Sequence, residues 1–252
     1  MRASAPAFVF VLALVVGGCG PARPQAGGIQ LAASDGVAVF GDWHPASSAP
    51  LGTIVVFNQG GGDVRGEYGL IIPRLNAADF DVLAVDLRRG GDRFGTVNRT
   101  ASGVGETEYS YCDAYLDVEA ALTEARRFDD HPILWGSSFS AALAIQAAAR
   151  RPTEVKAVLA FSPATGDPMD GCMPESFAQG LASPLLVLRA IHETKFPSVR
   201  AQLRAMTEMG HIVHVSDPGT HGSSTLDSTR VGASTQETWR VVETFLGGLP
   251  FG

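Results

Sequence analysis

An α/β fold, with a mostly parallel central sheet and helices on both faces, is the fold class that the 252-residue sequence predicts. Two observations indicate it. Short apolar runs alternate with amphipathic stretches along the chain, and the run at 53–58 is apolar and β-branched almost throughout. Such continuous runs are typical of strands in a parallel sheet that helices cover on both sides.

The strands can be placed in order. Residues 29–34 and 37–45 alternate in polarity around an Asp35-Gly36 turn, which predicts an antiparallel hairpin at the edge of the sheet. The later strands are expected at 53–58, 81–86, 132–136, 155–163, 184–191 and 211–217.

Helical spacing of apolar residues fills most of the intervals between these strands. Helices are expected at 68–79, 111–127, 137–150, 200–208 and 234–249. The segment 88–106, which is rich in Gly, Arg and Asn, is expected to be a long loop. We find no internal repeat, and about 220 residues suit one large core better than two, so a single domain is predicted over 29–252.

The N-terminus carries an export signal. Arg2 precedes an apolar run that extends to Cys19 and is too short to span a bilayer comfortably. The small residues before Cys19 resemble the lipobox of bacterial lipoproteins. That resemblance implies that residues 1–18 are removed and that Cys19 is lipidated, which would anchor the protein to the cell envelope, at the outer membrane where one exists. An ordinary secretory signal is the alternative.

Residues 19–28 are rich in Pro and Gly and are expected to form a flexible tether. The net charge of −7 and the absence of a basic cluster argue against a nucleic-acid partner. Cys112 and Cys172 are the only other cysteines; an exported domain can join them in a disulfide, but the sequence leaves free thiols equally open. Neither cysteine has the spacing of a zinc site, and no metal or organic cofactor is implied.

The strongest motif is the junction ILWGSSFSAALA, where a buried strand runs through Gly136 and Ser138 directly into a helix. It resembles the nucleophile elbow G-x-S-x-G of the α/β-hydrolase superfamily, with Ser140 in place of the last glycine. The resemblance implies that Ser138 is a nucleophile. The competing interpretation makes Ser137, Ser138 and Ser140 ordinary helix-capping serines.

A serine hydroxyl needs a base, and in this superfamily the base follows the last strand of the sheet. His221 stands there, whereas His44, His131, His211 and His214 lie within or before strands. The family's acid lies in the loop 192–198, where Glu193 stands four residues before Pro197. Asp167 and Asp217 are alternatives for the acid, and His192 has no assigned role.

Stabilisation of an oxyanion requires two backbone N–H donors. The resemblance implies Phe139, which follows the nucleophile, together with the loop Gln59, Gly60, Gly61 and Gly62, which resembles the HGGG-type loop of esterases. The chain order Ser138, Glu193, His221 is that of the superfamily.

The resemblance implies a serine hydrolase, similar to esterases without a large cap, that acts on a small-molecule acyl substrate. Only about 20 residues separate the strand ending near Pro163 from the next one, too few for a cap domain. A catalytically silent surface-binding protein and a peptidase or amidase with the same triad are the alternatives. Arg88, Arg89 or Arg93 is a candidate contact for an anionic substrate, although a solvated loop charge is the simpler interpretation.

Overall fold

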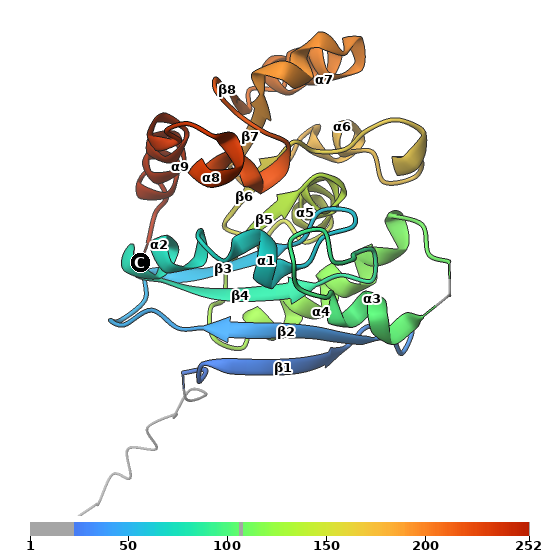
Figure 1. The fold of residues 1–252 in the computed structure, drawn as a ribbon, viewed down its shortest axis with the longest axis vertical. Coiled ribbons are helices and arrows are strands. Elements are labelled where there is room, and N and C mark those ends of the chain that lie inside the picture. Colours follow the sequence, from blue (N-terminus) through green and yellow to red (C-terminus); the bar gives the residue numbers. More distant parts are fainter. Residues whose placement is uncertain (1–22, 106–107, 252) are drawn as a thin grey trace, which may run out of the picture.

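The computed structural model describes residues 23–105 and 108–251, and the sheet of this part confirms the predicted fold class. Eight strands form one sheet in the order β1-β2-β4-β3-β5-β6-β7-β8. In Figure 1, β1 lies at one edge, and β7 and β8 lie at the other, beside α7. The predicted signal peptide and Cys19 fall outside the described residues.

The first two strands form the predicted hairpin. β1 (Gly27–Ala32) pairs antiparallel with β2 (Ala38–His44), and β2 pairs antiparallel with β4. All other neighbours in the sheet are parallel. Their bounds are β3 Gly52–Phe57, β4 Phe80–Asp86, β5 Ile133–Ser137, β6 Ala157–Phe161, β7 Leu185–Ala190 and β8 Ile212–Ser216.

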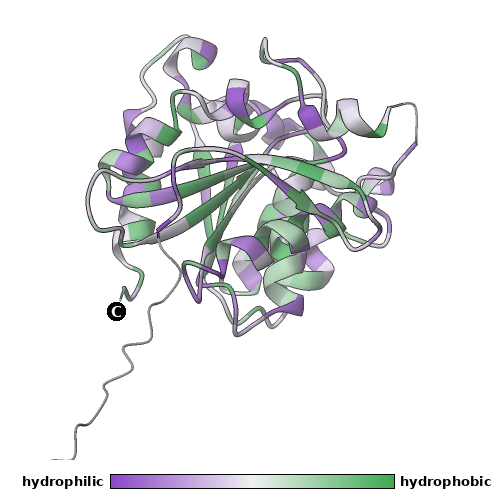
Figure 2. Ribbon diagram, turned by 90° about the horizontal axis from the view of Figure 1, so that it is seen from below, coloured by the Kyte–Doolittle hydropathy of each residue, from purple (hydrophilic) through white to green (hydrophobic). Residues whose placement is uncertain are grey.

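Helices cover the sheet on both faces because successive side chains of a buried strand point to opposite sides. Val55 and Phe57 of β3 belong to a core shared with α4, α5 and α7. Ile54 and Val56 of the same strand belong to a second core shared with α1, α2 and α9. Figure 2 shows the mostly hydrophobic strands between these two helical layers.

The helices are α1 Val64–Tyr68, α2 Ile72–Ala77, α3 Arg99–Val104, α4 Tyr115–Ala125, α5 Phe139–Arg150, α6 Pro174–Ala178, α7 Pro197–Glu208, α8 Ser228–Val231 and α9 Gln236–Gly247. In the described residues none of them is long and apolar enough to cross a bilayer. Short 3₁₀ turns include η1 (Cys112–Ala114), η2 (Asp167–Met169), η3 (Ile191–Lys195) and η4 (Gly222–Leu226).

Three details differ from the sequence-based expectation. The predicted loop 88–106 contains α3, which begins where the Asn98 side chain accepts the N–H of Ala101 at 2.8 Å. The short helices α1, α6 and α8 were not expected at all. Within the segment 19–28 that was predicted as a tether, β1 already begins at Gly27, and the Arg23 guanidinium pairs with the buried carboxylate of Asp81 at 2.5 Å.

The carboxyl ends of the parallel strands all lie on the same side of the sheet, and ligands bind beside these strand ends in open α/β folds. The loops after β3, β5, β6, β7 and β8 all leave the sheet on this side. These loops contain most of the residues that the sequence assigned to catalysis.

Candidate active site

Ser138 occupies a sharp turn between β5 and α5. Its backbone has φ 61° and ψ −119°, a conformation in which a non-glycine residue is strained and which is found mainly at functional sites. The turn is held by its own backbone, since Ser138 donates its N–H to Phe161 at 2.8 Å and its carbonyl accepts the N–H of Ala164 at 3.0 Å. Gly136 is required beneath it, because a Cβ there would lie 2.4 Å from the backbone N of Ala141.

Ser140, the departure from the glycine of the motif, is part of this turn. Its buried Oγ accepts the N–H of Ser137 at 2.8 Å and lies within donating distance of the carbonyl oxygens of Ser137, at 2.9 Å, and Phe57, at 3.2 Å. The hydroxyl therefore ties the end of β5 and the first turn of α5 to β3.

Glu193 and His221 are brought together. The Nδ1 of His221 lies 2.5 Å from Oε1 of Glu193, which is buried in η3 directly after β7. The side chain of His221 is 40% exposed, and its Nε2 has no hydrogen-bond partner among the described residues. This arrangement orients an imidazole and stabilises its cationic form, as the third member of a triad does.

The carboxylate of Glu193 has three further polar contacts, one of which is the N–H of Ala190, which donates to Oε2 at 3.2 Å. The Ser162 hydroxyl donates to Oε2 at 2.8 Å, and the buried guanidinium of Arg189 lies 3.6 Å from the same oxygen. Burial alone would raise the pKa of Glu193, but the His221 hydrogen bond and the charge of Arg189 outweigh it and lower the pKa to about 2. Glu193 is therefore ionised at neutral pH.

The histidine loop lies directly on the nucleophile elbow. The N–H of Ser223 donates to Ser137 Oγ at 3.0 Å, and the N–H of Gly222 donates to Ser162 Oγ at 3.0 Å. Gly222 has φ +68°, and a Cβ there would lie 2.3 Å from Ser137 Oγ, so only glycine fits. The Ser138 hydroxyl makes no hydrogen bond to His221 in the described residues; such contacts often form only when substrate is bound.

The alternative acids and histidines do not lie beside Glu193 and His221. Asp167, Asp217 and His192 are exposed, and none of them bonds to His221. His211 contacts the carbonyl of Ala178 at 2.9 Å, beside α6. His44 and His214 lie on strands, and His131 is exposed before β5.

The expected oxyanion donors include one residue that the structure rules out. The N–H of Gln59 donates to the buried carboxylate of Glu67 at 2.8 Å, so it is not available to a substrate, contrary to the sequence-based expectation. The N–H of Gly62 is likewise used, by the carbonyl of Gln59 at 3.0 Å. In the described residues the N–H groups of Gly60, Gly61 and Phe139 have no such partner, and Phe139 begins α5.

Glu67, for which the sequence predicted no role, joins α1 to the loop after β3 and to α8. Its carboxylate accepts the backbone N–H of Gln59 and the Gln59 side-chain amide, at 2.8 and 3.1 Å. Burial raises its pKa to about 7, although the hydroxyl of Ser137 and the amides of Gln59 act in the opposite direction. Arg230, after the histidine loop, donates to the Glu67 carbonyl at 3.0 Å.

Tyr111 forms a wall beside the oxyanion loop. Its ring stacks on Phe139 with centroids 4.8 Å apart, and a Cβ on Gly60 would lie 3.0 Å from its hydroxyl. The next residue, Cys112, is joined to Cys172 in a disulfide with Cα atoms 5.7 Å apart. The bridge connects the segment before α4 with the segment between β6 and β7.

The three arginines proposed as anion contacts occupy different environments. Arg88 is buried between Asp117 and Asp35, at 2.6 and 2.5 Å, and is therefore a structural residue rather than a substrate contact. Arg89 lies over the Tyr111 ring at 4.8 Å. Arg93 is exposed and reaches Gln59 Oε1 at 3.4 Å.

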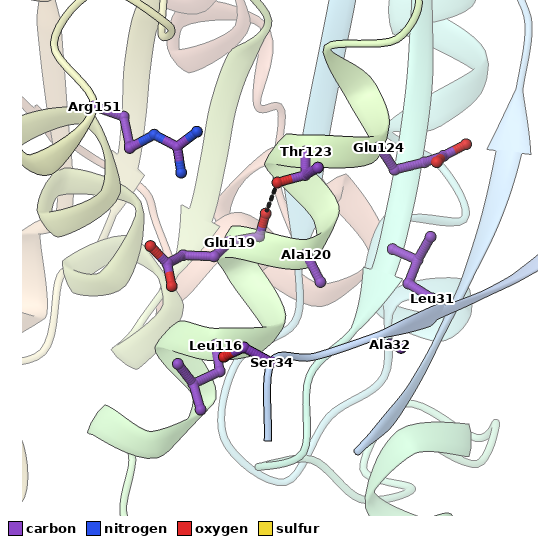
Figure 3. A pocket seen from close by; sticks show the side chains of 9 residues that line it. All are labelled: Leu31, Ala32, Ser34, Leu116, Glu119, Ala120, Thr123, Glu124 and Arg151. Carbon is purple, nitrogen blue, oxygen red and sulfur yellow. Dashed lines mark hydrogen bonds between the residues drawn. The ribbon is translucent and has the colours of Figure 1, made fainter. Parts of the chain in front are cut away.

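Two hollows flank the oxyanion loop. One, of about 460 Å³, is lined by His221, Thr220, Gln59 and Arg93 among others. The other, of about 340 Å³, is lined by Gly61, Arg89 and Tyr111 among others. A separate cavity of about 410 Å³ between β1 and α4, bordered by Glu119, Glu124 and Arg151, contains none of the candidate catalytic residues (Figure 3).

Comparison with solved structures agrees with this architecture. An esterase from Pyrococcus furiosus has a TM-score of 0.64 and 16% identity over 90% of this chain and 94% of its own. Est1E from Butyrivibrio proteoclasticus has a TM-score of 0.63 and 13% identity over 88% and 98%. Acylaminoacyl peptidase from Pyrococcus horikoshii has a TM-score of 0.61 and 14% identity over 88% of this chain, which spans only 41% of that protein.

At these identities the likeness establishes the fold alone, and no curated protein sequence matches the chain. The family is established separately, because the model of the serine aminopeptidase family S33 matches residues 49–231, from β3 to α8. This chain therefore has the α/β-hydrolase fold and belongs to the S33 serine aminopeptidase family.

Proposed function

We propose that the protein cleaves an ester or related acyl bond through an acyl-enzyme intermediate formed on Ser138. The observation that carries the proposal is the Glu193–His221 hydrogen bond of 2.5 Å, on a loop that packs against the strained Ser138 turn. An ionised acid, a partly exposed imidazole and a serine in a strained strand-to-helix turn are the parts that nucleophilic catalysis needs.

In the proposed reaction His221 takes the proton of the Ser138 hydroxyl as the oxygen attacks the carbonyl carbon. The tetrahedral oxyanion is stabilised by the N–H of Phe139 and by Gly60 or Gly61. His221 then gives its proton to the leaving group, and the acyl group stays on Ser138. A water molecule attacks this acyl-enzyme by the same steps in reverse, with Glu193 stabilising the imidazolium each time.

The direct test combines covalent labelling with turnover. We expect a fluorophosphonate probe to modify the purified domain at Ser138, mapped by mass spectrometry, and short-chain p-nitrophenyl esters to be hydrolysed. Ser138→Ala should lose labelling and lower kcat/KM by about 10⁴-fold or more. A domain that neither labels nor turns over these esters would instead be the catalytically silent binding protein.

Aminopeptidase activity is the second candidate, favoured by the S33 family match over residues 49–231. It uses the same triad, so only the substrate separates it from esterase activity. Aminoacyl p-nitroanilides compared with p-nitrophenyl esters of the same acyl group distinguish the two. A higher kcat/KM for the anilides would assign the protein as a peptidase.

We further propose that the domain is exported and anchored by a lipid on Cys19, which lies outside the described residues. The support is the sequence before Cys19. Metabolic labelling with an alkyne fatty acid should mark the wild-type protein but not Cys19→Ala. Export of an unlabelled wild-type protein would indicate an ordinary secretory signal.

A further inference from the structure

The hollows beside the candidate site are lined by arginines, whereas the whole protein is acidic. The chain has a net charge of −7. Nevertheless, both hollows beside the oxyanion loop contain arginines, and no Asp or Glu of the described residues lines either of them. A cationic lining in an acidic protein raises the local concentration of anionic ligands.

The two arginines of the 340 Å³ hollow differ in what neutralises them. Arg88 has two carboxylate partners, Asp35 and Asp117. Arg89 is half-buried, and no carboxylate of the described residues pairs with it. Its guanidinium stacks on the Tyr111 ring instead. The hollow therefore contains one guanidinium whose charge is not balanced by a described residue.

Arg89 is also held in place. The side-chain amide of Asn58 donates to the Arg89 carbonyl at 3.2 Å, and the following loop is fixed to the glycine loop by the N–H of Gly91, which donates to Gly62 at 3.0 Å. The guanidinium, the Tyr111 ring and the Phe139 ring form a continuous stack with successive spacings of 4.8 Å. A pre-organised guanidinium loses little entropy when it binds a ligand.

The position of this hollow decides which part of a substrate it receives. It shares Gly61 with the oxyanion loop, and its wall, Tyr111, packs on Phe139, the residue after the nucleophile. His221, which protonates the leaving group, lines the other hollow. A substrate whose leaving group lies beside His221 would have its acyl group on the side of the hollow with Arg89.

We infer that Arg89 binds a carboxylate at the far end of the acyl chain, so that the preferred substrates are half-esters of dicarboxylic acids. The inference rests on the proposed hydrolase function. The reaction is ordinary ester hydrolysis: water is consumed, the C–O bond to the alcohol breaks, and the alcohol, the dicarboxylate and one proton are released. Arg89 takes no part in bond breaking and supplies a planar donor pair that matches a carboxylate.

The test uses p-nitrophenyl esters whose acyl chains end either in a carboxylate or in a methyl group at the same length, over the succinate to adipate range. The measured quantity is the ratio of kcat/KM for the anionic ester to kcat/KM for its neutral partner. A charge-assisted hydrogen-bonded pair predicts a wild-type ratio of about 10 or more at the best chain length. Arg89→Gln should lower this ratio about tenfold.

Arg93→Gln is the matched control, because Arg93 lies on the same loop but lines the other hollow. It removes the same charge and should leave the ratio close to the wild-type value. The inference is overturned by a wild-type ratio below one at every length, or by equal losses in the two variants, which would indicate a general electrostatic effect. Absence of turnover of the neutral esters, together with absence of fluorophosphonate labelling, is the different result that rejects the hydrolase function itself.

Discussion

Nδ1 of His221 lies 2.5 Å from Oε1 of Glu193, although 28 residues separate them in the chain. This contact joins the loop after β7 to the loop after β8, and the parallel pairing of the two strands brings the loops together. The Ser162 hydroxyl contacts both loops, donating to Glu193 and accepting from Gly222. The acid and the base are thus fixed to each other and to β6.

Replacing Glu193 with glutamine should remove the charge that stabilises the His221 imidazolium and leave the side chain in place. We expect kcat to fall by about 10²–10⁴-fold while labelling of Ser138 slows in parallel. Steady-state kinetics on a neutral p-nitrophenyl ester provides the measurement. Asp167→Asn, at the exposed alternative acid, should retain wild-type kcat; a larger loss there than at Glu193 would reassign the acid.

The Ser140→Ala variant tests whether the serine in the elbow is structural. Its Oγ accepts the buried N–H of Ser137, which would have no partner in the variant. An unsatisfied buried donor costs about 1–3 kcal/mol, so the free energy of unfolding in urea should fall by that amount. Ser47→Ala, at an exposed serine, should change it by less than about 0.5 kcal/mol. Equal stabilities for the two variants would contradict the role of Ser140.

The Cys112–Cys172 disulfide should stabilise the domain. Native protein with Cys19 replaced is expected to show no titratable thiol. The bridge spans a sequence separation of 60 residues. In the chain-entropy model, closing a loop of that length stabilises the folded protein relative to the unfolded chain by roughly 4 kcal/mol at most. Dithiothreitol should therefore lower Tm in this protein but not in the double variant Cys112→Ser/Cys172→Ser. Two titratable thiols in the native protein would show that the bridge is absent.

The sequence predicted those parts of the candidate site that depend on the pattern of adjacent residues. The β5–Ser138–α5 junction combines a buried strand, small residues and an Ala-rich helix, and each of these can be read from adjacent residues. The position of His221 followed from the order of strands. Both predictions use sequence features that can be recognised without knowledge of side-chain packing.

The residues that the sequence missed act through packing between distant segments. Glu67 lies in a segment for which the sequence predicted no helix or strand, and only the approach of the Gly60–Gly62 loop to α1 buries it against Gln59. The same contact takes the Gln59 N–H out of the oxyanion hole. Ser162 likewise gives no local signal, since its hydroxyl becomes important only when β6, β7 and β8 are aligned.

Glu67 leads to a prediction about stability and pH. Burial raises its pKa in the folded protein to about 7 from an ordinary value of 4.5. The folded state therefore binds more protons than the unfolded state between these values, and the stability that Glu67 contributes is full below pH about 4.5 and is lost as pH rises through about 7.

Glu67→Gln stays neutral and lacks this dependence. The free energy of unfolding of the wild type, measured relative to the variant by urea titration, should thus fall by roughly 2–4 kcal/mol across that pH window. Glu208→Gln, at an exposed glutamate, should follow the wild type at each pH. A wild-type-minus-variant difference that is constant, or that increases with pH, would mean that Glu67 is ionised in the folded protein throughout the window.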